Sequence, residues 1–169
     1  HAPRRYDGTG LTWPGLAATY EGKPLALHPH QRNALARILD KQDIDDSALL
    51  THKVGAGKTL CAIVGVMKRL QLGLSKRPIV VVPRHIRDQW AAAWLALYPG
   101  HVDWLIVDGD DTTDGLARLM TGQGRILLTT YERFLAIPVE PEILGAYLQR
   151  ELDELKEAQD DLDEGASHD

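Results

Sequence analysis

Several features that mark other classes of protein are missing from this chain of 169 residues. Cys61 is the single cysteine, so no internal disulfide can form, which fits a reducing cytoplasm. No apolar run approaches the roughly 18 residues that a membrane-spanning helix needs, so we expect no membrane partner. The start, residues 1–5, leads into no apolar stretch, and we expect no secretory signal peptide. Since the first residue is not Met, we expect a processed product or a piece of a longer protein.

The composition that is present suits one globular α/β domain, but its charge is unevenly distributed. Hydrophobic residues make up 44% and charged residues 25% of the chain, which is enough for a proper core. The net charge is −5, yet residues 1–139 are mildly basic and residues 140–169 strongly acidic. A basic body can face a polyanion, although a mixed surface with one solvated acidic helix explains the same charges.

Apolar segments alternate with helical periodicity through the middle of the chain. The pattern predicts strands over 48–51, 79–82, 104–107 and 126–129, and helices over 28–39, 58–72, 86–97 and 113–121. Strands that are apolar throughout and separated by helices imply a parallel sheet covered on both faces. We therefore predict a three-layer α/β/α domain with a mostly parallel sheet.

Three regions follow from these patterns. Residues 1–24 are rich in Gly, Pro, Tyr and Trp and are expected to form an extended arm. Residues 25–139 form the predicted α/β lobe. Residues 140–169 begin with Pro141, which suits a first helical turn, and continue with leucines near a heptad spacing. We predict an acidic amphipathic helix there, which either packs on its own domain or binds a partner.

The strongest motif is a phosphate-binding loop between a predicted strand and a predicted helix. Gly55 and Gly57 let the backbone bend so that successive N–H groups face phosphate oxygens. The next helix adds the positive end of its dipole, Lys58 reaches the β- and γ-phosphates, and the Thr59 hydroxyl ligates Mg²⁺. The candidate nucleotide-binding residues of this loop are His52, Lys53, Val54, Gly55, Ala56, Gly57, Lys58 and Thr59. Lys58 and Thr59 are also the candidate catalytic residues.

The loop departs from the full pattern at one position. The pattern has Gly six residues before Lys58, where this chain has His52. A glycine-rich turn with an accidental Lys-Thr pair is the alternative, but the flanking strand and helix favour the phosphate-binding loop.

Thr51 to Thr59 resembles motif I of superfamily 2 helicases. Upstream, Leu27-His28-Pro29-His30-Gln31-Arg32 resembles the Q-motif of the Swi/Snf-type members. The resemblance implies that Gln31 reads the adenine edge, for which an amide offers both a donor and an acceptor. A solvated glutamine on a helix is the simpler explanation of that residue taken alone.

Two further stretches resemble helicase motifs that contact nucleic acid. The segment 80–83, followed by Gln89-Trp90, resembles motif Ia, and 126–132 resembles the end of motif Ib. By this resemblance the candidate contacts to DNA are Pro83, Arg84, Arg87, Thr129, Thr130 and Tyr131. Each stretch taken singly could also be an ordinary strand end with its loop, whereas their order and spacing are more specific.

Residues 6–15, 97–99 and 137–142 narrow the resemblance to the large helicases of phages and plasmids, some of which are fused to an adenine DNA methylase. These proteins usually carry Glu where this chain has Lys53. The resemblance implies a RecA-like fold, ATP and Mg²⁺ as cofactors, and ATP-driven movement on DNA.

Catalytic parts of such a motor are missing from the sequence. A Walker B element needs an apolar strand that ends in Asp-Glu, but Asp153-Glu154 and Asp163-Glu164 both lie in the predicted acidic helix. A second lobe with an arginine finger is also missing. We expect an ATP-binding helicase lobe that does not hydrolyse ATP efficiently alone. The alternatives are a truncated or regulatory nucleotide-binding module without turnover, and an unrelated P-loop enzyme such as a small kinase.

Overall fold

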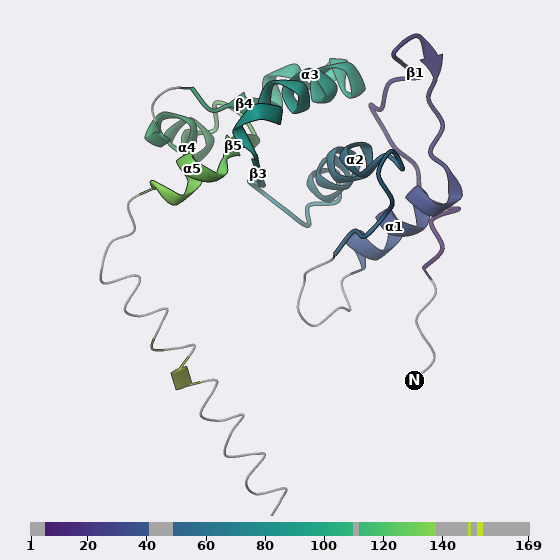
Figure 1. Cartoon of the computed structure of the whole chain (residues 1–169), viewed down its shortest axis with the longest axis horizontal. Helices are drawn as coiled ribbons and strands as arrows, with labels where there is room; N and C mark the ends of the chain where they lie inside the picture. Colours follow the sequence, from purple (N-terminus) through teal and green to yellow (C-terminus); the bar gives the residue numbers. More distant parts are fainter. Residues whose placement is uncertain (1–5, 41–48, 110–111, 138–148, 150–151, 154–169) are drawn as a thin grey trace, which may run out of the picture. The chain divides into compact units, whose positions relative to one another are not determined.

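The computed structural model describes residues 6–40, 49–109, 112–137, 149 and 152–153, and the chain divides into the compact units 1–135 and 136–169. In the first unit the α-helices are α1 (Pro29–Leu39), α2 (Lys58–Gln71), α3 (Arg87–Leu97), α4 (Thr112–Thr121) and α5 (Tyr131–Leu135) (Figure 1). The strands are β1 (Thr19–Tyr20), β2 (Lys23–Pro24), β3 (Ile79–Val82), β4 (Leu105–Val107) and β5 (Ile126–Thr130). Two 3-10 helices are η1 (Arg84–Ile86) and η2 (Pro99–Trp104).

The central sheet has the strand order β3-β5-β4, and both neighbouring pairs are parallel. The register aligns Val80 with Leu128 and Ile106 with Leu127. Strand β5 lies in the middle, and all of its residues are buried. Parallel neighbours need a crossover, and the helices α3 and α4 carry the chain between the strands (Figure 1). The parallel sheet predicted from the sequence is confirmed.

Helices cover both faces of this sheet. Along β5 successive side chains point to opposite faces. Ile126 belongs to a core that includes Met67 of α2 and Trp94 of α3. Leu127 packs instead in a second cluster with Leu119 of α4. Helices on both faces of a parallel sheet give a RecA-like α/β/α domain, as the sequence predicts.

The described part of the predicted arm, residues 6–24, is tied to helix α2. Lys68 Nζ donates a hydrogen bond to the Thr12 carbonyl at 2.7 Å, and Gln71 Nε2 donates to the Pro14 carbonyl at 2.8 Å. The arm ends in the short antiparallel pair β1–β2, which the sequence does not predict.

The strand predicted over residues 48–51 is wrong for the described residues 49–51, which have no regular structure. Ala48 lies outside the described residues. Leu49 is 80% exposed, in contrast to the buried strand β5. A strand is stable only where a neighbour satisfies its backbone N–H and C=O groups. Within the described residues, β3 pairs with β5 only, and no strand lies beside 49–51, so an apolar run there is not sufficient.

In the second unit, only Gln149, Leu152 and Asp153 of the predicted acidic helix are described, and all three are helical. Gln149 Nε2 donates to Asp153 Oδ1 at 2.9 Å, one helical turn away. Asp153 therefore lies on a helix and does not end a strand, while Glu154, Asp163 and Glu164 lie outside the described residues. No helix within the described ranges is both long and apolar enough to cross a membrane.

Candidate functional site

Two glycines in the left-handed backbone region shape the loop 52–59. Gly55 and Gly57 have φ values of 80° and 81°, a left-handed region that side chains rarely adopt. Gly57 is the N-cap of α2, and its carbonyl accepts the Cys61 N–H at 3.0 Å. The two glycines thus turn the chain directly into the first turn of the helix, where unpaired N–H groups point out of the helix end.

The Lys58 side chain bonds back to the start of this loop. Its Nζ donates to the His52 carbonyl at 2.7 Å and to the Lys53 carbonyl at 3.3 Å. Both partners are neutral backbone acceptors, so the positive charge of Lys58 is solvated but has no carboxylate in these bonds. An arriving phosphate would offer this ammonium a charged acceptor, which forms a stronger hydrogen bond.

The chemistry of these residues fits a nucleoside triphosphate with Mg²⁺. The first turn of α2 contains no acidic side chain, so nothing there competes with an anion for the helix N-terminus. Thr59 follows Lys58 in that turn and is half-buried. The N–H groups at the helix start and Lys58 would hold the phosphates, and the Thr59 hydroxyl would hold the metal.

Gln31 connects helix α1 to the loop. Its Oε1 accepts the His28 N–H at 2.9 Å, which completes a capping box, and its Nε2 donates to the Ala56 carbonyl at 3.1 Å. Gln31 is only 5% exposed. A Cβ at Gly57 would overlap the Gln31 amide nitrogen, so the loop and the glutamine lie in direct contact. The amide keeps one N–H and one lone pair for a ligand.

Two histidines that the sequence does not assign to the site, His28 and His30, lie near Gln31, and His30 also lies beside the loop. The ring of His30 stacks on that of His28 at 5.7 Å and meets His52 edge-on at 5.2 Å. His30 Nε2 lies 3.3 Å from the Ala56 carbonyl. Their signal in the sequence is their position next to Gln31. No cluster of three metal-ligating side chains occurs in the part of the chain that the structure describes.

A cavity of about 590 Å³ lies between α1 and the segment that leads into the loop. The guanidinium of Arg37 lies 5.8 Å from the ring centre of Tyr6 at this cavity. The lining residues are Tyr6, His30, Asn33, Ala34, Arg37, Ile38, Leu49, Leu50, Thr51 and His52.

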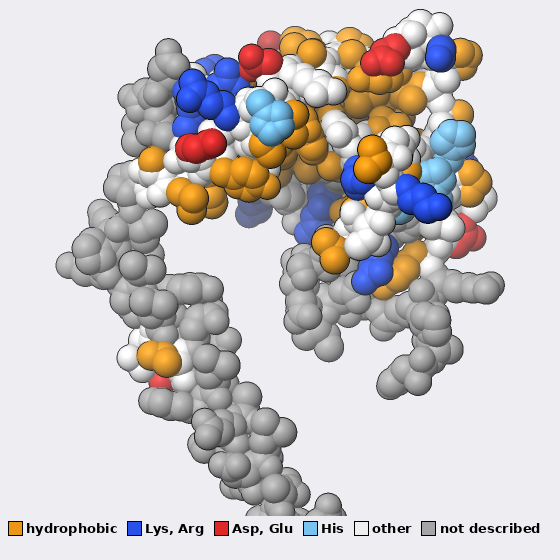
Figure 2. All heavy atoms as spheres, in the orientation of Figure 1, with side chains coloured by type: hydrophobic (Ala, Val, Ile, Leu, Met, Phe, Trp, Pro, Cys, Tyr) orange, Lys and Arg blue, Asp and Glu red, His pale blue; other side chains and the backbone are white. Residues whose placement is uncertain are grey.

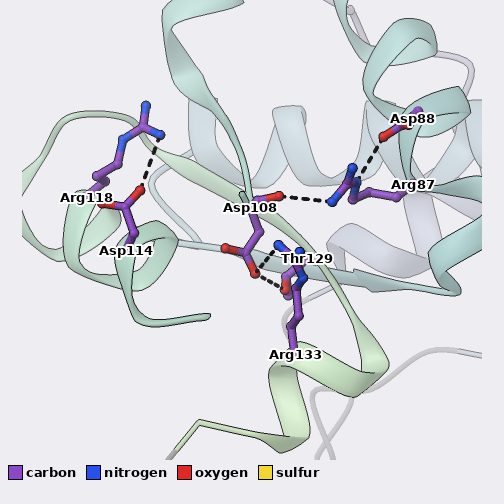
Figure 3. Close-up of polar contacts among 7 residues, drawn as sticks. All are labelled: Arg87, Asp88, Asp108, Asp114, Arg118, Thr129 and Arg133. Carbon is purple, nitrogen blue, oxygen red and sulfur yellow. Dashed lines mark hydrogen bonds and ion pairs between the residues drawn. The ribbon is translucent and has the colours of Figure 1, made fainter. Parts of the chain in front are cut away.

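The second candidate region, here called the strand-end edge, is formed by the carboxyl ends of β3, β4 and β5 and the residues that follow them (Figure 3). Parallel strands bring these ends to one edge of the sheet. Arg87 begins α3 after β3, its NH1 donates to the Asp108 carbonyl at 3.1 Å, and its Nε donates to Asp88 Oδ1 at 2.9 Å. Thr129 of β5 donates its hydroxyl to Asp108 Oδ2 at 2.7 Å.

The residues predicted to contact DNA differ in their accessibility at this edge. Arg84 is exposed and Tyr131 is 53% exposed, so both can reach a ligand. Pro83 and Arg87 are half-buried. Thr129 and Thr130 are buried, with 2% and 1% of the residue exposed. Contacts by those two hydroxyls would require a rearrangement, because the Thr129 hydroxyl already bonds to Asp108.

Glu132 balances the charge of the exposed arginine at this edge. Its pKa lies below the usual value because its own backbone N–H and the Thr130 hydroxyl bond to the carboxylate, and because Arg84 and Arg133 lie nearby. The carboxylate therefore stays ionised through the neutral range. An incoming phosphate would compete with Glu132 for Arg84.

Asp108 and Arg133 are members of this edge that the sequence does not reveal. Arg133 NH1 of α5 lies 3.9 Å from Asp108 Oδ2, and the Asp108 side chain is almost fully buried. The only sequence feature that could have indicated Asp108 is that it is a polar residue directly after an apolar strand, and this feature is equally typical of a turn.

The face of the molecule seen in Figure 2 carries both hydrophobic and charged side chains. Figure 2 shows hydrophobic side chains interspersed with Lys, Arg and His side chains on this face. The surface alone therefore does not select a polyanion as partner.

The sequence matches the family described as "Type III restriction enzyme, res subunit" over residues 24–162. This range includes Gln31, the loop 52–59 and the strand-end edge. A search of curated proteins found no match.

Proposed function

Because the chain belongs to the family of type III restriction enzyme res subunits, and thus carries a superfamily 2 helicase-like, ATP-binding domain, we propose that it is the first lobe of a DNA helicase or translocase. In this proposal the loop 52–59 binds MgATP, and the strand-end edge contacts one DNA strand.

The observation that carries the nucleotide part is the junction of α1, the loop and α2. Two glycines with positive φ lead into a helix N-terminus, Lys58 lies across the loop mouth, and Gln31 bonds to the loop backbone. An anion meets unpaired N–H groups and an ammonium at one point. We propose that Gln31 uses its remaining N–H and lone pair on the adenine edge, which would favour ATP over GTP.

Lys58 and Thr59 would carry out complementary tasks in this site. The Lys58 ammonium would exchange its two backbone carbonyl acceptors for phosphate oxygens, and the Thr59 hydroxyl would orient the metal. When bound, Mg²⁺ would neutralise charge on the phosphates. The His52 and Lys53 carbonyls would lose their bonds to Lys58, and the Lys53 side chain would add one more positive charge near the triphosphate.

The DNA part of the proposal rests on the strand-end edge. Arg84 and Tyr131 are accessible, and Arg87 is held at the same edge by its bond to the Asp108 carbonyl. Guanidinium groups and backbone N–H groups at strand ends contact phosphates without reading sequence. Pro83, Thr129 and Thr130 would shape the two turns that carry these contacts.

We further propose that residues 25–139 act as the lobe, with residues 1–24 as its arm and 140–169 as a helical extension, in a protein related to the large phage and plasmid helicases. The water-orienting carboxylate and the arginine finger would come from a Walker B strand and a second lobe. Asp153, the described member of the two Asp-Glu pairs, lies on a helix, which supports this arrangement.

A binding experiment separates the proposed lobe from its alternatives. Fluorescence anisotropy with a labelled single-stranded oligodeoxythymidine would be measured with and without MgATP. We expect binding that weakens steeply with salt. Nucleotide binding without any DNA binding would instead favour the regulatory module, and phosphate transfer to a small acceptor would favour the kinase. Family membership favours the helicase lobe over the kinase.

A further inference from the structure

Asp108 contacts three other elements of the strand-end edge, β5, α5 and α3. It follows strand β4, and its Oδ2 accepts the Thr129 hydroxyl of β5 at 2.7 Å. The same oxygen lies 3.9 Å from Arg133 NH1 of α5, and the Asp108 backbone carbonyl accepts Arg87 NH1 of α3 (Figure 3). The ends of β4 and β5 are thereby linked to the helices α3 and α5.

The surroundings are built around this carboxylate. The side chain of Asp108 is 2% exposed and that of Arg133 is 19% exposed, so both charges are largely removed from water. Burying a carboxylate is costly unless a cation and hydrogen bonds compensate it. Space is also tight, since a Cβ at Gly115 would lie 2.8 Å from Asp108 Oδ1. A neutral or apolar residue would spare the molecule this cost.

The two segments that Asp108 holds are those proposed to contact DNA. Arg87 follows the η1 turn that carries Arg84, and Thr129 precedes Thr130 and Tyr131. We propose that Asp108 is a positioning residue for the nucleic-acid backbone, which fixes these two turns at the spacing that lets them bind one strand together. This inference rests on the proposed DNA function.

Removing the charge of Asp108 should change the affinity for DNA in opposite directions, depending on whether Asp108 positions the two turns or only adds negative charge near them. If Asp108 were only an acid near a basic edge, removing its charge would strengthen binding to a polyanion. If Asp108 holds the turns in place, removing its charge weakens binding although the protein becomes more positive.

The test compares Asp108→Asn with the matched control Asp114→Asn on α4, an exposed acid that pairs with Arg118 at 3.8 Å. The probe is a fluorescein-labelled single-stranded oligodeoxythymidine, titrated over a series of salt concentrations. For Asp108→Asn we expect binding about tenfold weaker and a slope of log K against log salt that is smaller by about one. For Asp114→Asn we expect unchanged or slightly tighter binding.

A second variant keeps the result interpretable if Asp108→Asn is unstable. Asp108→Asn/Arg133→Gln has the wild-type net charge and leaves neither partner as a lone buried charge. Positioning predicts that it also binds about tenfold more weakly than wild type, whereas a pure charge effect predicts wild-type affinity. MgADP affinity, measured in parallel, should stay unchanged in both variants.

Each outcome decides a different point. Weaker DNA binding with intact nucleotide binding supports the inference. Equal or tighter DNA binding by Asp108→Asn, or wild-type binding by the double variant, overturns it and leaves the proposed function in place. A wild-type chain that binds no oligonucleotide contradicts the proposed DNA function itself, and the inference with it.

Discussion

The loop 52–59 and the strand-end edge, the two regions that we propose to bind anions, are built differently. The loop 52–59 relies on the backbone: two glycines set its shape, and Lys58 and Gln31 bond to its carbonyls. The strand-end edge relies more on side chains: the buried Asp108 carboxylate accepts the Thr129 hydroxyl and lies near Arg133, while Arg87 bonds to the Asp108 carbonyl. The first should therefore be most sensitive to backbone conformation, and the second to the balance of charge.

The largest difference that we predict is between binding and hydrolysis. We propose that the loop binds phosphates, but binding the ground state and the transition state equally does not accelerate a reaction. We expect the rate of ATP hydrolysis by this chain, with DNA present, to be far below that of a helicase. We identified no arginine finger in the sequence, and such a residue alone raises the rate ~10³–10⁵-fold in related systems. A steady-state phosphate-release assay measures it. DNA-stimulated turnover that is lost in Glu164→Gln would show that the acidic extension supplies the catalytic carboxylate.

The dependence of the loop on its backbone can be tested with two alanine variants. Gly55→Ala places a side chain at positive φ in open space, at a cost of about 1–2 kcal/mol. Gly57→Ala adds an overlap with the Gln31 amide, so we expect a larger loss of MgADP affinity and of stability against urea. Adding Gln31→Ala to Gly57→Ala removes the overlap, so the double variant should lose no more MgADP affinity and stability than Gly55→Ala does. Equal losses in the two glycine variants would mean that the contact between Gln31 and the loop contributes little.

At the strand-end edge the accessible arginine should matter more than a basic residue elsewhere. We expect Arg84→Ala to weaken oligonucleotide binding several-fold and to lower the salt slope by about one. Arg118→Ala on α4, whose partner is Asp114, is the matched control and should change binding less. Anisotropy titrations at several salt concentrations measure both. Similar effects of the two variants would point to a general attraction of charge without a defined edge.

The smallest effect concerns base choice. Gln31→Ala should reduce the preference for ATP over GTP by a few-fold, since one neutral hydrogen bond contributes about 0.5–1.5 kcal/mol. Competition titrations against a fluorescent nucleotide give both affinities. If the wild type shows no preference, Gln31 does not read the base and serves only to join α1 to the loop.

The two regions also differ in how far the sequence predicts them. The loop is local: Gly55, Gly57 and Lys58 are adjacent in the chain, and the positive φ values and the helix start follow from them. The parallel sheet and its two helical layers follow from local periodicity as well. The contact between Gln31 and Ala56 joins residues far apart in the chain, so local patterns do not predict it. The family resemblance predicts that Gln31 reads the adenine edge, which stays a prediction.

The strand-end edge was predictable only in outline. Its turns follow from strand ends, but the role of Asp108 depends on Thr129, Arg87 and Arg133, which come from three other elements. No local pattern distinguishes such an aspartate from one in a turn. The predicted strand at 48–51 was wrong over residues 49–51 for a related reason, because strand formation depends on a neighbour that the local sequence does not specify.

The most direct test of the account is a calorimetric titration of MgATP into the wild-type chain and into Lys58→Ala. Lys53→Ala is the matched control, since that lysine lies in the same loop but contributes its carbonyl to the described contacts. We predict measurable wild-type binding, a loss of ~1.5–3 kcal/mol in Lys58→Ala, and a smaller change in Lys53→Ala. Equal affinity of the wild type and Lys58→Ala would contradict the assignment of residues 52–59 as the ATP site.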